Sequence, residues 1–210
     1  MLTREIMRKF APKCVNPQEW ADALNAAGAR VGIKTRRQWA HFMAQLHVEC
    51  EGFTDFEEDL WYSPERLMAV WPKRFPTLAS TAGIAGNPKA LANRVYNGRE
   101  GNRIGSDDGW YFRGRGPKQI THRNNHTAFQ KWLAAQGLPH QTILNPDLLT
   151  TPVVGALSAA WFWQANDLND VLAAESNDRA ALKSVTKIVN GGYNGLDARQ
   201  LALTRFLAVA

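Results

Sequence analysis

The sequence predicts a mainly α-helical fold with at most one short β-hairpin. Three positions place a helix-capping side chain directly before a proline, which suits the first position of a helix; these are Asn16-Pro17, Ser63-Pro64 and Asn87-Pro88. Thr35 is a further cap, and apolar residues follow it at helical spacing, at Trp39, Phe42, Met43 and Leu46. Alternation of period two is weak and confined to the stretch 101–120. Helices therefore dominate the prediction.

The second half of the chain is predicted to hold four further helices. We expect them at about 126–136, 151–165, 178–189 and 197–208. Gly137 ends the first of these helices and the Gly191-Gly192 pair ends the third, as glycine commonly does. Between Asn97 and Gln119 the sequence holds six glycines and an aromatic cluster, and we expect a long loop. A long loop inside a compact domain is usually functional or disordered, and the aromatic cluster argues against disorder.

Composition fits a single folded domain over residues 1–210. Hydrophobic residues at 45% and charged residues at 21% lie near globular averages, and the length allows a sizeable core. No stretch reaches about 18 consecutive apolar residues, so we expect no stable membrane insertion. The first ten residues, MLTREIMRKF, are too charged for the apolar core of a signal peptide. We therefore expect a protein that is made in the cytoplasm.

The positive net charge of +6 favours polyanionic partners. Charge alone does not separate nucleic acid from anionic polymers of the cell envelope. The basic residues are scattered among aliphatic ones, and no helix-turn-helix, finger or aromatic-stacking motif is visible. We expect no specific nucleic-acid partner.

The two cysteines, Cys14 and Cys50, are too few for a disulfide scaffold and are predicted to be buried free thiols. His47 and Cys50 resemble half of a metal site, but no second pair at ligand spacing follows them. The sequence therefore predicts no metal and no other cofactor.

Glu49 is the most informative single residue. On a helix that starts near Arg36, it falls within about 20° of Phe42 and about 60° of Leu46, on the apolar face. Because Gly52 is a natural stop, Glu49 is expected in the last turn, where the helix dipole disfavours negative charge. Poor solvation and the dipole predict a raised pKa, which suits a general acid. The alternative is a glutamate at the rim whose carboxylate reaches water or an arginine.

Hydrolysis of a glycosidic bond needs a second carboxylate opposite the first, about 6.5–9.5 Å away for inversion or about 5–5.5 Å away for retention. Five acids follow closely, namely Glu51, Asp55, Glu57, Glu58 and Asp59. On one continuous helix Glu58 would lie about 13 Å further along and point away from Glu49. The helix must therefore end near Gly52, so that the segment GFTDFEEDL folds back. Spacing does not choose among the five acids, and a solvated acidic loop is the alternative.

The segments that contain these acids, together with several later blocks, resemble a known family. The segments HVECEGF and FEEDLWYS resemble the catalytic glutamate segments of glycoside hydrolase family 19, which includes chitinases and the lysozymes of bacteria and phages. Further blocks resemble the family in the same order, namely WYFRGRGPKQITHRNN, LNPDLL, AAWFW and VTKIVNGGYNG. The resemblance spans roughly residues 39 to 200. It implies a lysozyme-like helical fold with a deep substrate cleft and an inverting mechanism.

The resemblance also implies the catalytic residues. Glu49 matches the general acid, and Glu58 matches the general base in the arrangement Glu-Glu-x-Leu-x-Tyr-Ser, in preference to Glu57. Thr121 matches the hydroxyl residue that holds the attacking water, which a hydroxyl suits because it both donates and accepts.

Four further residues are expected to bind the sugar substrate, namely Gln119, Asn125, Asn190 and Tyr62. Amides suit this work because they offer donors and an acceptor, although each of the three amides could equally be a turn or cap residue. For Tyr62 and for Trp110, packing in the core is an equal alternative to stacking on a sugar ring. The run AAWFW is expected to be core.

Three residues depart from the family pattern. Lys118 replaces a residue that is commonly aliphatic, while Asn124 and His126 replace residues that are often tyrosine. These changes affect the expected sugar contacts and leave the catalytic pair in place. A lysine near the cleft would favour an anionic substrate such as peptidoglycan.

The resemblance, the charge and the size together predict a phage or prophage endolysin that cleaves peptidoglycan glycan strands, with no separate wall-binding module. Such an enzyme would be a monomer that waits in the host cytoplasm and acts in the periplasm once a holin opens the membrane. One alternative is a chitinase of the same family. Another is a binding module that has lost catalysis, and the presence of Glu49, Glu58 and Thr121 argues against it.

Overall fold

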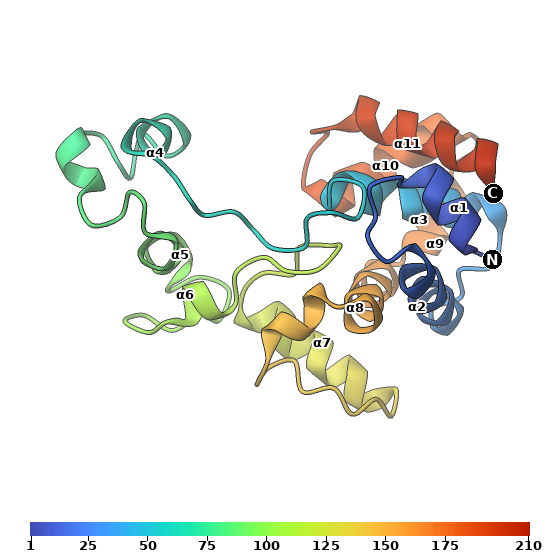
Figure 1. Ribbon diagram of the computed structural model, residues 1–210, viewed down its shortest axis with the longest axis horizontal. Coiled ribbons are helices and arrows are strands. Elements are labelled where there is room, and N and C mark those ends of the chain that lie inside the picture. Colours follow the sequence, from blue (N-terminus) through green and yellow to red (C-terminus); the bar gives the residue numbers. More distant parts are fainter. The chain divides into compact units, whose positions relative to one another are not determined.

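The structure, a computed structural model, describes residues 1–210 and is built from helices (Figure 1). Eleven are α-helices and two are short 3-10 helices: α1 Arg4–Phe10, α2 Pro17–Arg30, α3 Arg36–Glu49, α4 Pro64–Val70, η1 Leu78–Thr81, α5 Pro88–Tyr96, α6 Asp108–Tyr111, α7 Arg123–Ala135, η2 Pro146–Thr150, α8 Pro152–Ala165, α9 Leu168–Ala174, α10 Asp178–Asn190 and α11 Leu196–Val209. The predicted mainly α fold is confirmed. In place of a hairpin there are two isolated antiparallel bridges, Glu57 with Arg115 and Arg115 with Ile120.

Most predicted helix starts carry the expected caps. The Thr35 hydroxyl accepts from the backbone N–H of Gln38, and the Gln38 side-chain oxygen accepts from the backbone N–H of Thr35, which completes a capping box. Ser63 and Asn87 likewise accept from the third residue of α4 and of α5. Asn16 is a correction, because its side chain makes no capping hydrogen bond and α2 begins on Pro17 alone.

The helices predicted for the second half of the chain are present. α8, α10 and α11 begin and end within a residue of their predicted limits, whereas α7 begins three residues early, at Arg123. Gly191 follows α10 in the left-handed conformation, as expected. Three short helices were not predicted, namely α1, α6 and α9. They have four to seven residues, too few for an apolar period to show.

The residue contacts divide the chain into two compact units, and the prediction of one domain over residues 1–210 stays a prediction. Unit 1 comprises Met1–Phe56, Gly116–Gln119 and Asp147–Ala210, and unit 2 comprises Glu57–Arg115 and Ile120–Pro146. Both chain termini belong to unit 1 (Figure 1).

α3 is the central helix of unit 1, where it contacts α10 and α11. The predicted apolar face is buried, and so are the polar residues between its members: every residue from Trp39 to Leu46 is buried. Aromatic rings fill the surrounding core, with Phe42 edge-on to Trp163 at 5.2 Å and Phe10 edge-on to Phe206 at 5.3 Å. Within AAWFW, Trp161 and Trp163 are buried as predicted.

Unit 2 has a smaller core of its own. It is formed by Leu60, Leu67, Phe75, Leu91, Ala92 and Val95. α6 packs against α5 at close range, because a Cβ on Gly109 would lie 2.5 Å from the carbonyl oxygen of Ala92. Only glycine permits this approach. The predicted loop 97–119 thus contains a short helix that is locked onto its neighbour.

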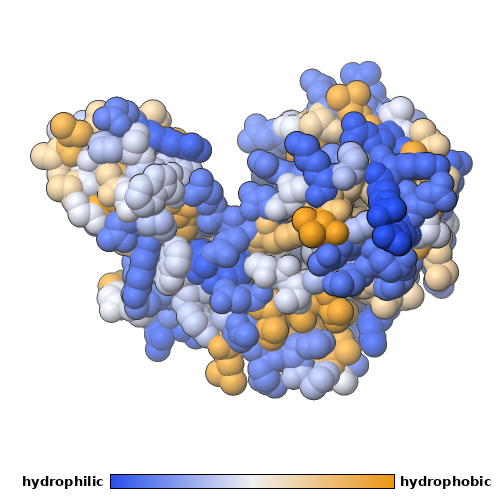
Figure 2. Space-filling model, in the orientation of Figure 1, coloured by the Kyte–Doolittle hydropathy of each residue, from blue (hydrophilic) through white to orange (hydrophobic).

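Apolar side chains that reach the surface are interspersed with hydrophilic ones on the face that Figure 2 shows. None of the helices has the length and apolar character that crossing a membrane would require. Cys14 and Cys50 are free and buried, as predicted.

Candidate active site

Glu49 is the last residue of α3, as the sequence predicts. Cys50 caps the helix by donating its backbone N–H to the carbonyl of Leu46, and Gly52 follows in the left-handed conformation at φ 72°. The helix therefore stops before the acidic segment. The Glu49 side chain is 11% exposed, so its carboxylate is largely removed from water.

The surroundings of this carboxylate differ from the prediction. In place of an apolar environment it has two cationic partners: Arg199 binds Oε1, and the Lys118 Nζ lies 3.3 Å from Oε2. Glu49 is poorly solvated, as expected, but it also reaches an arginine, as the alternative described. The reason is tertiary: Arg199 comes from α11, 150 residues away along the chain.

Arg199 is held within a buried polar chain. It is 1% exposed, and its Nη1 donates to the side-chain oxygen of Gln45, one turn before Glu49 on α3. The Gln45 amide in turn donates to the hydroxyl of Thr186 on α10, over 3.1 Å. Three helices of unit 1 thus fix one guanidinium beside Glu49. A buried arginine keeps its charge and presents several donors in a rigid plane, which suits it to orienting a carboxylate.

Lys118 approaches Glu49 from the segment Gly116–Gln119. Its ammonium also lies 4.5 Å from the ring centroid of Phe162, a cation–π contact. Burial lowers the pKa of Lys118, and the charge of Glu49 opposes that shift. The idea that this lysine attracts an anionic substrate is not supported, since its side chain is only 11% exposed and its charge is engaged by Glu49.

Glu58 lies in unit 2 and is held by neutral donors. The Tyr96 hydroxyl, at the end of α5, donates to Oε1, and the backbone N–H of Gly114 donates to Oε2 over 3.2 Å. The Glu58 backbone N–H donates to the carbonyl of Gly114, so the segment itself is fixed. Burial and then the negative charge of Glu58 raise the pKa of Tyr96 well above its usual value, so that the phenol stays a donor.

Glu57, the neighbouring acid, has a different environment. Its Oε1 accepts from the Arg113 Nε over 2.6 Å and from the same guanidinium's Nη2, and Arg113 also lies over the Trp110 ring at 3.7 Å. Glu57 is thus the structural partner of an arginine. Glu58 accepts hydrogen bonds from neutral donors and has no cation in contact, a difference between the two acids that spacing alone did not reveal.

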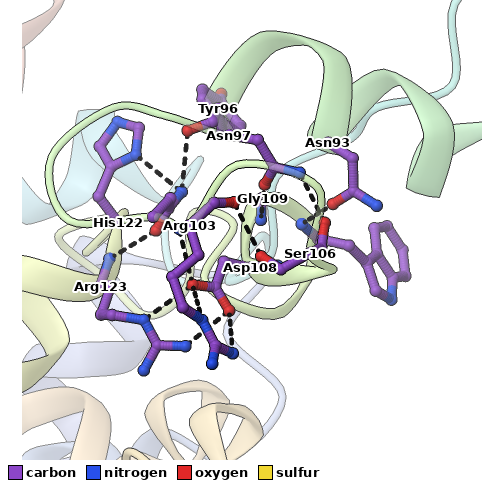
Figure 3. Close-up of polar contacts among 11 residues, drawn as sticks. Asn93, Tyr96, Asn97, Arg103, Ser106, Asp108, Gly109, His122 and Arg123 are labelled. Carbon is purple, nitrogen blue, oxygen red and sulfur yellow. Dashed lines mark hydrogen bonds and ion pairs between the residues drawn. The ribbon is translucent and has the colours of Figure 1, made fainter.

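A polar network around Asp108 braces the loop that leaves α5 (Figure 3). Asp108, 3% exposed, accepts from the Arg103 and Arg123 side chains, and Arg123 lowers its pKa well below the usual range although burial opposes this. The Asn102 amide donates to the carbonyl of Tyr96 and contacts the His122 ring. The loop is therefore tied both to α7 and to the residue that holds Glu58.

The predicted Thr121 and Asn125 lie together in unit 2. Thr121 is half-buried, and its backbone carbonyl accepts from the Asn125 side-chain amide over 2.9 Å. Asn125 thus also serves the local structure, one of the two roles considered for it. In unit 1, Gln119 donates its amide to the carbonyl of Gly116 over 3.2 Å, and Asn190 is exposed at the end of α10.

Tyr62 packs in the core of unit 2. It lies against the cluster around Leu67, its ring is 5.1 Å from that of Trp71, and Arg66 covers the ring at 4.6 Å. Trp110 packs against the same cluster. Both residues are partly buried and pack as the alternative described, and sugar binding by Tyr62 stays a prediction.

The backbone is strained next to several of these residues. Glu51 and Phe53, just beyond Glu49, adopt φ of 46° and 66°, and Gln119 and His122 adopt 53° and 72°. Residues other than glycine rarely enter this region, and such outliers cluster at functional sites.

The predicted site residues divide between the units. Glu49, Gln119 and Asn190 belong to unit 1, and Glu58, Thr121, Asn125 and Tyr62 to unit 2. The arrangement of Glu49 and Glu58 on opposite sides of a deep cleft stays a prediction. Sequence reasoning missed Arg199, Arg113 and Tyr96, for which no local pattern gives a signal. No group of three or more His, Cys, Asp or Glu residues is placed to hold a metal ion.

Solved structures with a similar fold are chitinases. Chitinase C from Streptomyces griseus superposes with a TM-score of 0.59 and 17% sequence identity, covering 99% of this chain and 76% of that one. A bacterial family 19 chitinase gives a TM-score of 0.55 at 15% identity, covering 99% and 94%. These likenesses establish the lysozyme-like, all-α fold.

Sequence comparison shows the family. No protein-family model matches the chain. A glycosyl hydrolase family 19 domain-containing protein of Haemophilus influenzae is 36% identical over 178 residues, which is 84% of this chain and 82% of that protein. The fold and this relative define the chain as a glycoside hydrolase. More particularly, it belongs to glycosyl hydrolase family 19.

Plant endochitinases match over shorter stretches. A Pisum sativum endochitinase is 37% identical over 94 residues, and an acidic 27 kDa endochitinase of Solanum lycopersicum is 36% identical over 109 residues. The matched stretches cover 28% and 40% of those proteins. The similarity to the plant enzymes is therefore partial.

Proposed function

We propose that this family 19 hydrolase cleaves the β-1,4 bonds of the peptidoglycan glycan strand and serves as an endolysin. The observation that carries the substrate choice is the net charge of +6. Peptidoglycan bears carboxylates on its peptide stems, or on the lactyl groups where stems are absent, whereas chitin is uncharged, so a basic enzyme is drawn to the former by long-range attraction. This attraction comes from the net charge of the whole chain and not from Lys118, because that buried lysine is already paired with Glu49.

The proposed mechanism is a single displacement with inversion. Protonated Glu49 gives its proton to the glycosidic oxygen as the bond from that oxygen to C1 breaks. Glu58 removes a proton from a water that Thr121 orients, and the oxygen of this water bonds to C1 from the opposite face. Arg199 and Lys118 hold the two oxygens of Glu49, and Tyr96 with the Gly114 N–H holds those of Glu58. Each carboxylate is thus fixed before substrate arrives, and fixed catalytic groups lower the barrier through orientation.

The decisive assay is release of reducing ends from purified Gram-negative sacculi. The wild type should cleave sacculi, and Glu49→Gln and Glu58→Gln should each lose at least about 10²-fold in rate. Glu57→Gln is the matched control, since that acid pairs with Arg113, and it should keep most of the activity. Absence of cleavage by the wild type, or unchanged rates in both active-site variants, would refute the proposal.

The stereochemistry of the product provides a separate test. Inversion of a β-1,4 bond releases the α-anomer first, which proton NMR detects before mutarotation. Release of the β-anomer would mean retention and would assign Glu58 a nucleophilic role.

A chitinase of the same family is the second candidate. The similarity to plant endochitinases and the fold shared with bacterial chitinases favour it. Colloidal chitin and sacculi compared at equal enzyme concentration decide between the candidates. A higher kcat/KM on chitin would replace the first proposal by this one.

The endolysin role makes further expectations. The enzyme should be monomeric by gel filtration and should act in the periplasm after a holin opens the membrane. Lysis of outer-membrane-permeabilised Gram-negative cells tests this role, because external enzyme then replaces the holin step. Permeabilised cells that stay intact while purified sacculi are cleaved would argue against lysis as the biological task.

A further inference from the structure

Unit 2 contains a basic surface pocket that none of the predicted site residues occupies. It has a volume of about 480 Å³ and is lined by the last residue of α4, by the four residues that follow this helix, and by the residue three beyond the end of α5. Its lining residues are Val70, Trp71, Pro72, Lys73, Arg74 and Arg99. Half of them are cationic and half are apolar.

The three cations of this pocket have no carboxylate partner. Arg74 and Arg99 each donate one Nη1 bond to the carbonyl of Val95, over 3.2 and 3.3 Å, and Lys73 makes no ion pair. One carbonyl satisfies only one of the donors on each guanidinium, which carries five. Most of the hydrogen-bonding capacity and all of the charge therefore remain available.

The shared carbonyl explains why the two arginines converge. Val95 is the next-to-last residue of α5, and the carbonyl end of a helix carries partial negative charge that attracts cations. A helix end accommodates part of one positive charge, about half an elementary charge. Three full positive charges around one pocket exceed that, so the pocket is an attractive place for an anion.

The apolar wall limits the kind of anion. Trp71 is fixed by ring contacts with Tyr62 at 5.1 Å and Phe75 at 6.4 Å, and its surface continues into Val70 and Pro72. Such a wall suits a ligand with short aliphatic groups beside its negative charge. A free inorganic anion would leave this wall unused.

We propose that this pocket binds the carboxylate-bearing peptide stems of peptidoglycan. Their side chains and termini combine carboxylates with methyl and methylene groups, the chemistry that the cations and the apolar wall accept. This inference rests on the proposed function, because it concerns the same substrate. It adds a peptide subsite to a glycan-cleaving enzyme.

The pocket is physically connected to the candidate base. Arg99 donates its backbone N–H to the carbonyl of Tyr96 over 3.3 Å, and the Tyr96 hydroxyl donates to Glu58. A peptide stem bound by Arg99 is therefore linked through hydrogen bonds to Tyr96, the residue that positions Glu58. The connection lies wholly within unit 2.

The first test compares two substrates. Sacculi are digested either intact or after an amidase has removed the peptide stems, and the double variant Lys73→Gln/Arg99→Gln is compared with the wild type. Arg94→Gln/Lys131→Gln is the matched control, because it removes the same charge from exposed positions of unit 2 outside the pocket. We expect KM for intact sacculi to rise about tenfold in the pocket variant only, with no change on stripped strands. Equal effects on both substrates, or none on intact sacculi, would overturn the peptide subsite.

The second test does not depend on cleavage. Calorimetry measures binding of a free stem tetrapeptide to the wild type and to the two double variants, with inorganic phosphate as a separate ligand. The peptide should bind the wild type and the control, and lose at least about tenfold in affinity with the pocket variant. Phosphate binding without peptide binding would reassign the pocket to phosphate-bearing polymers. If the wild type cleaves no sacculi but still binds the peptide at this pocket, the proposed function fails and the subsite stands.

Discussion

His126 should make the stability of this protein depend on pH in the weakly acidic range. It lies on α7, is fully buried, and neither ring nitrogen has a hydrogen-bond partner. Its ring centroid is 5.0 Å from that of Phe112. Burial, reinforced by the positive charge of Arg115, lowers the pKa of His126 to about 4 from 6.5, while the carbonyl of Ile120 opposes the shift.

The sign and size of the effect follow from this shift. Because the pKa is lower in the folded state, the unfolded chain binds more protons below pH 6.5, and stability falls as pH decreases toward 4. Between pH 7.5 and 4.5 the loss from this group is about 2 to 3 kcal/mol, at about 1.36 kcal/mol per pKa unit. That is a large share of the stability of an ordinary domain.

The variant His126→Phe isolates this contribution. Phenylalanine keeps a ring beside Phe112 but does not titrate, while His41, His47 and His122, whose pKa values are also lowered, remain in both proteins. Urea unfolding is followed by tryptophan fluorescence at several pH values from 7.5 to 4.5. As pH falls from 7.5 to 4.5, the free energy of unfolding of the wild type should decrease by about 2 kcal/mol more than that of the variant. Parallel curves for the two proteins would refute the reasoning.

Three further substitutions test the supports of the candidate site. Lys118→Met should lower kcat about tenfold on sacculi, because Glu49 loses a charge-assisted hydrogen bond, and unchanged kcat would contradict this. Tyr96→Phe should lower kcat by a similar factor, because Glu58 loses a donor that holds it in place; an unchanged kcat would exclude that role. Asp108→Asn should reduce the free energy of unfolding by about 3 kcal/mol, since two flanking arginines lose their buried partner, and a loss under 1 kcal/mol would show that solvent replaces it.

Local chemistry made much of the fold predictable. Capping side chains and glycine stops act within a few residues, so Thr35, Ser63 and Gly191 mark real helix ends. Asn16 makes no capping hydrogen bond, yet α2 still begins at Pro17. A proline at the first helical position has the φ angle of a helix and is sufficient to start it without a side-chain cap. The division into two units had no local signal, because it depends on which distant segments pack together.

The candidate site was predictable in its acids but not in their surroundings. Helical periodicity placed Glu49 correctly at the end of α3, and the resemblance selected Glu58. The cations at Glu49 come from positions 69 and 150 residues distant, beyond any periodic pattern. The distinction between Glu57 and Glu58 likewise depends on Arg113 and Tyr96, which only the folded chain brings into contact.

The left-handed backbone at Glu51, Gln119 and His122 has a consequence for engineering. Substitution by glycine or asparagine at these positions would be an obvious way to raise thermal stability, because these two residues adopt a positive φ at a lower energetic cost. The same exchanges would loosen segments adjoining Glu49 and Thr121, so thermal tolerance and turnover should respond in opposite directions. Mutant libraries designed to raise the thermal stability of this enzyme should therefore vary the exposed faces of the helices.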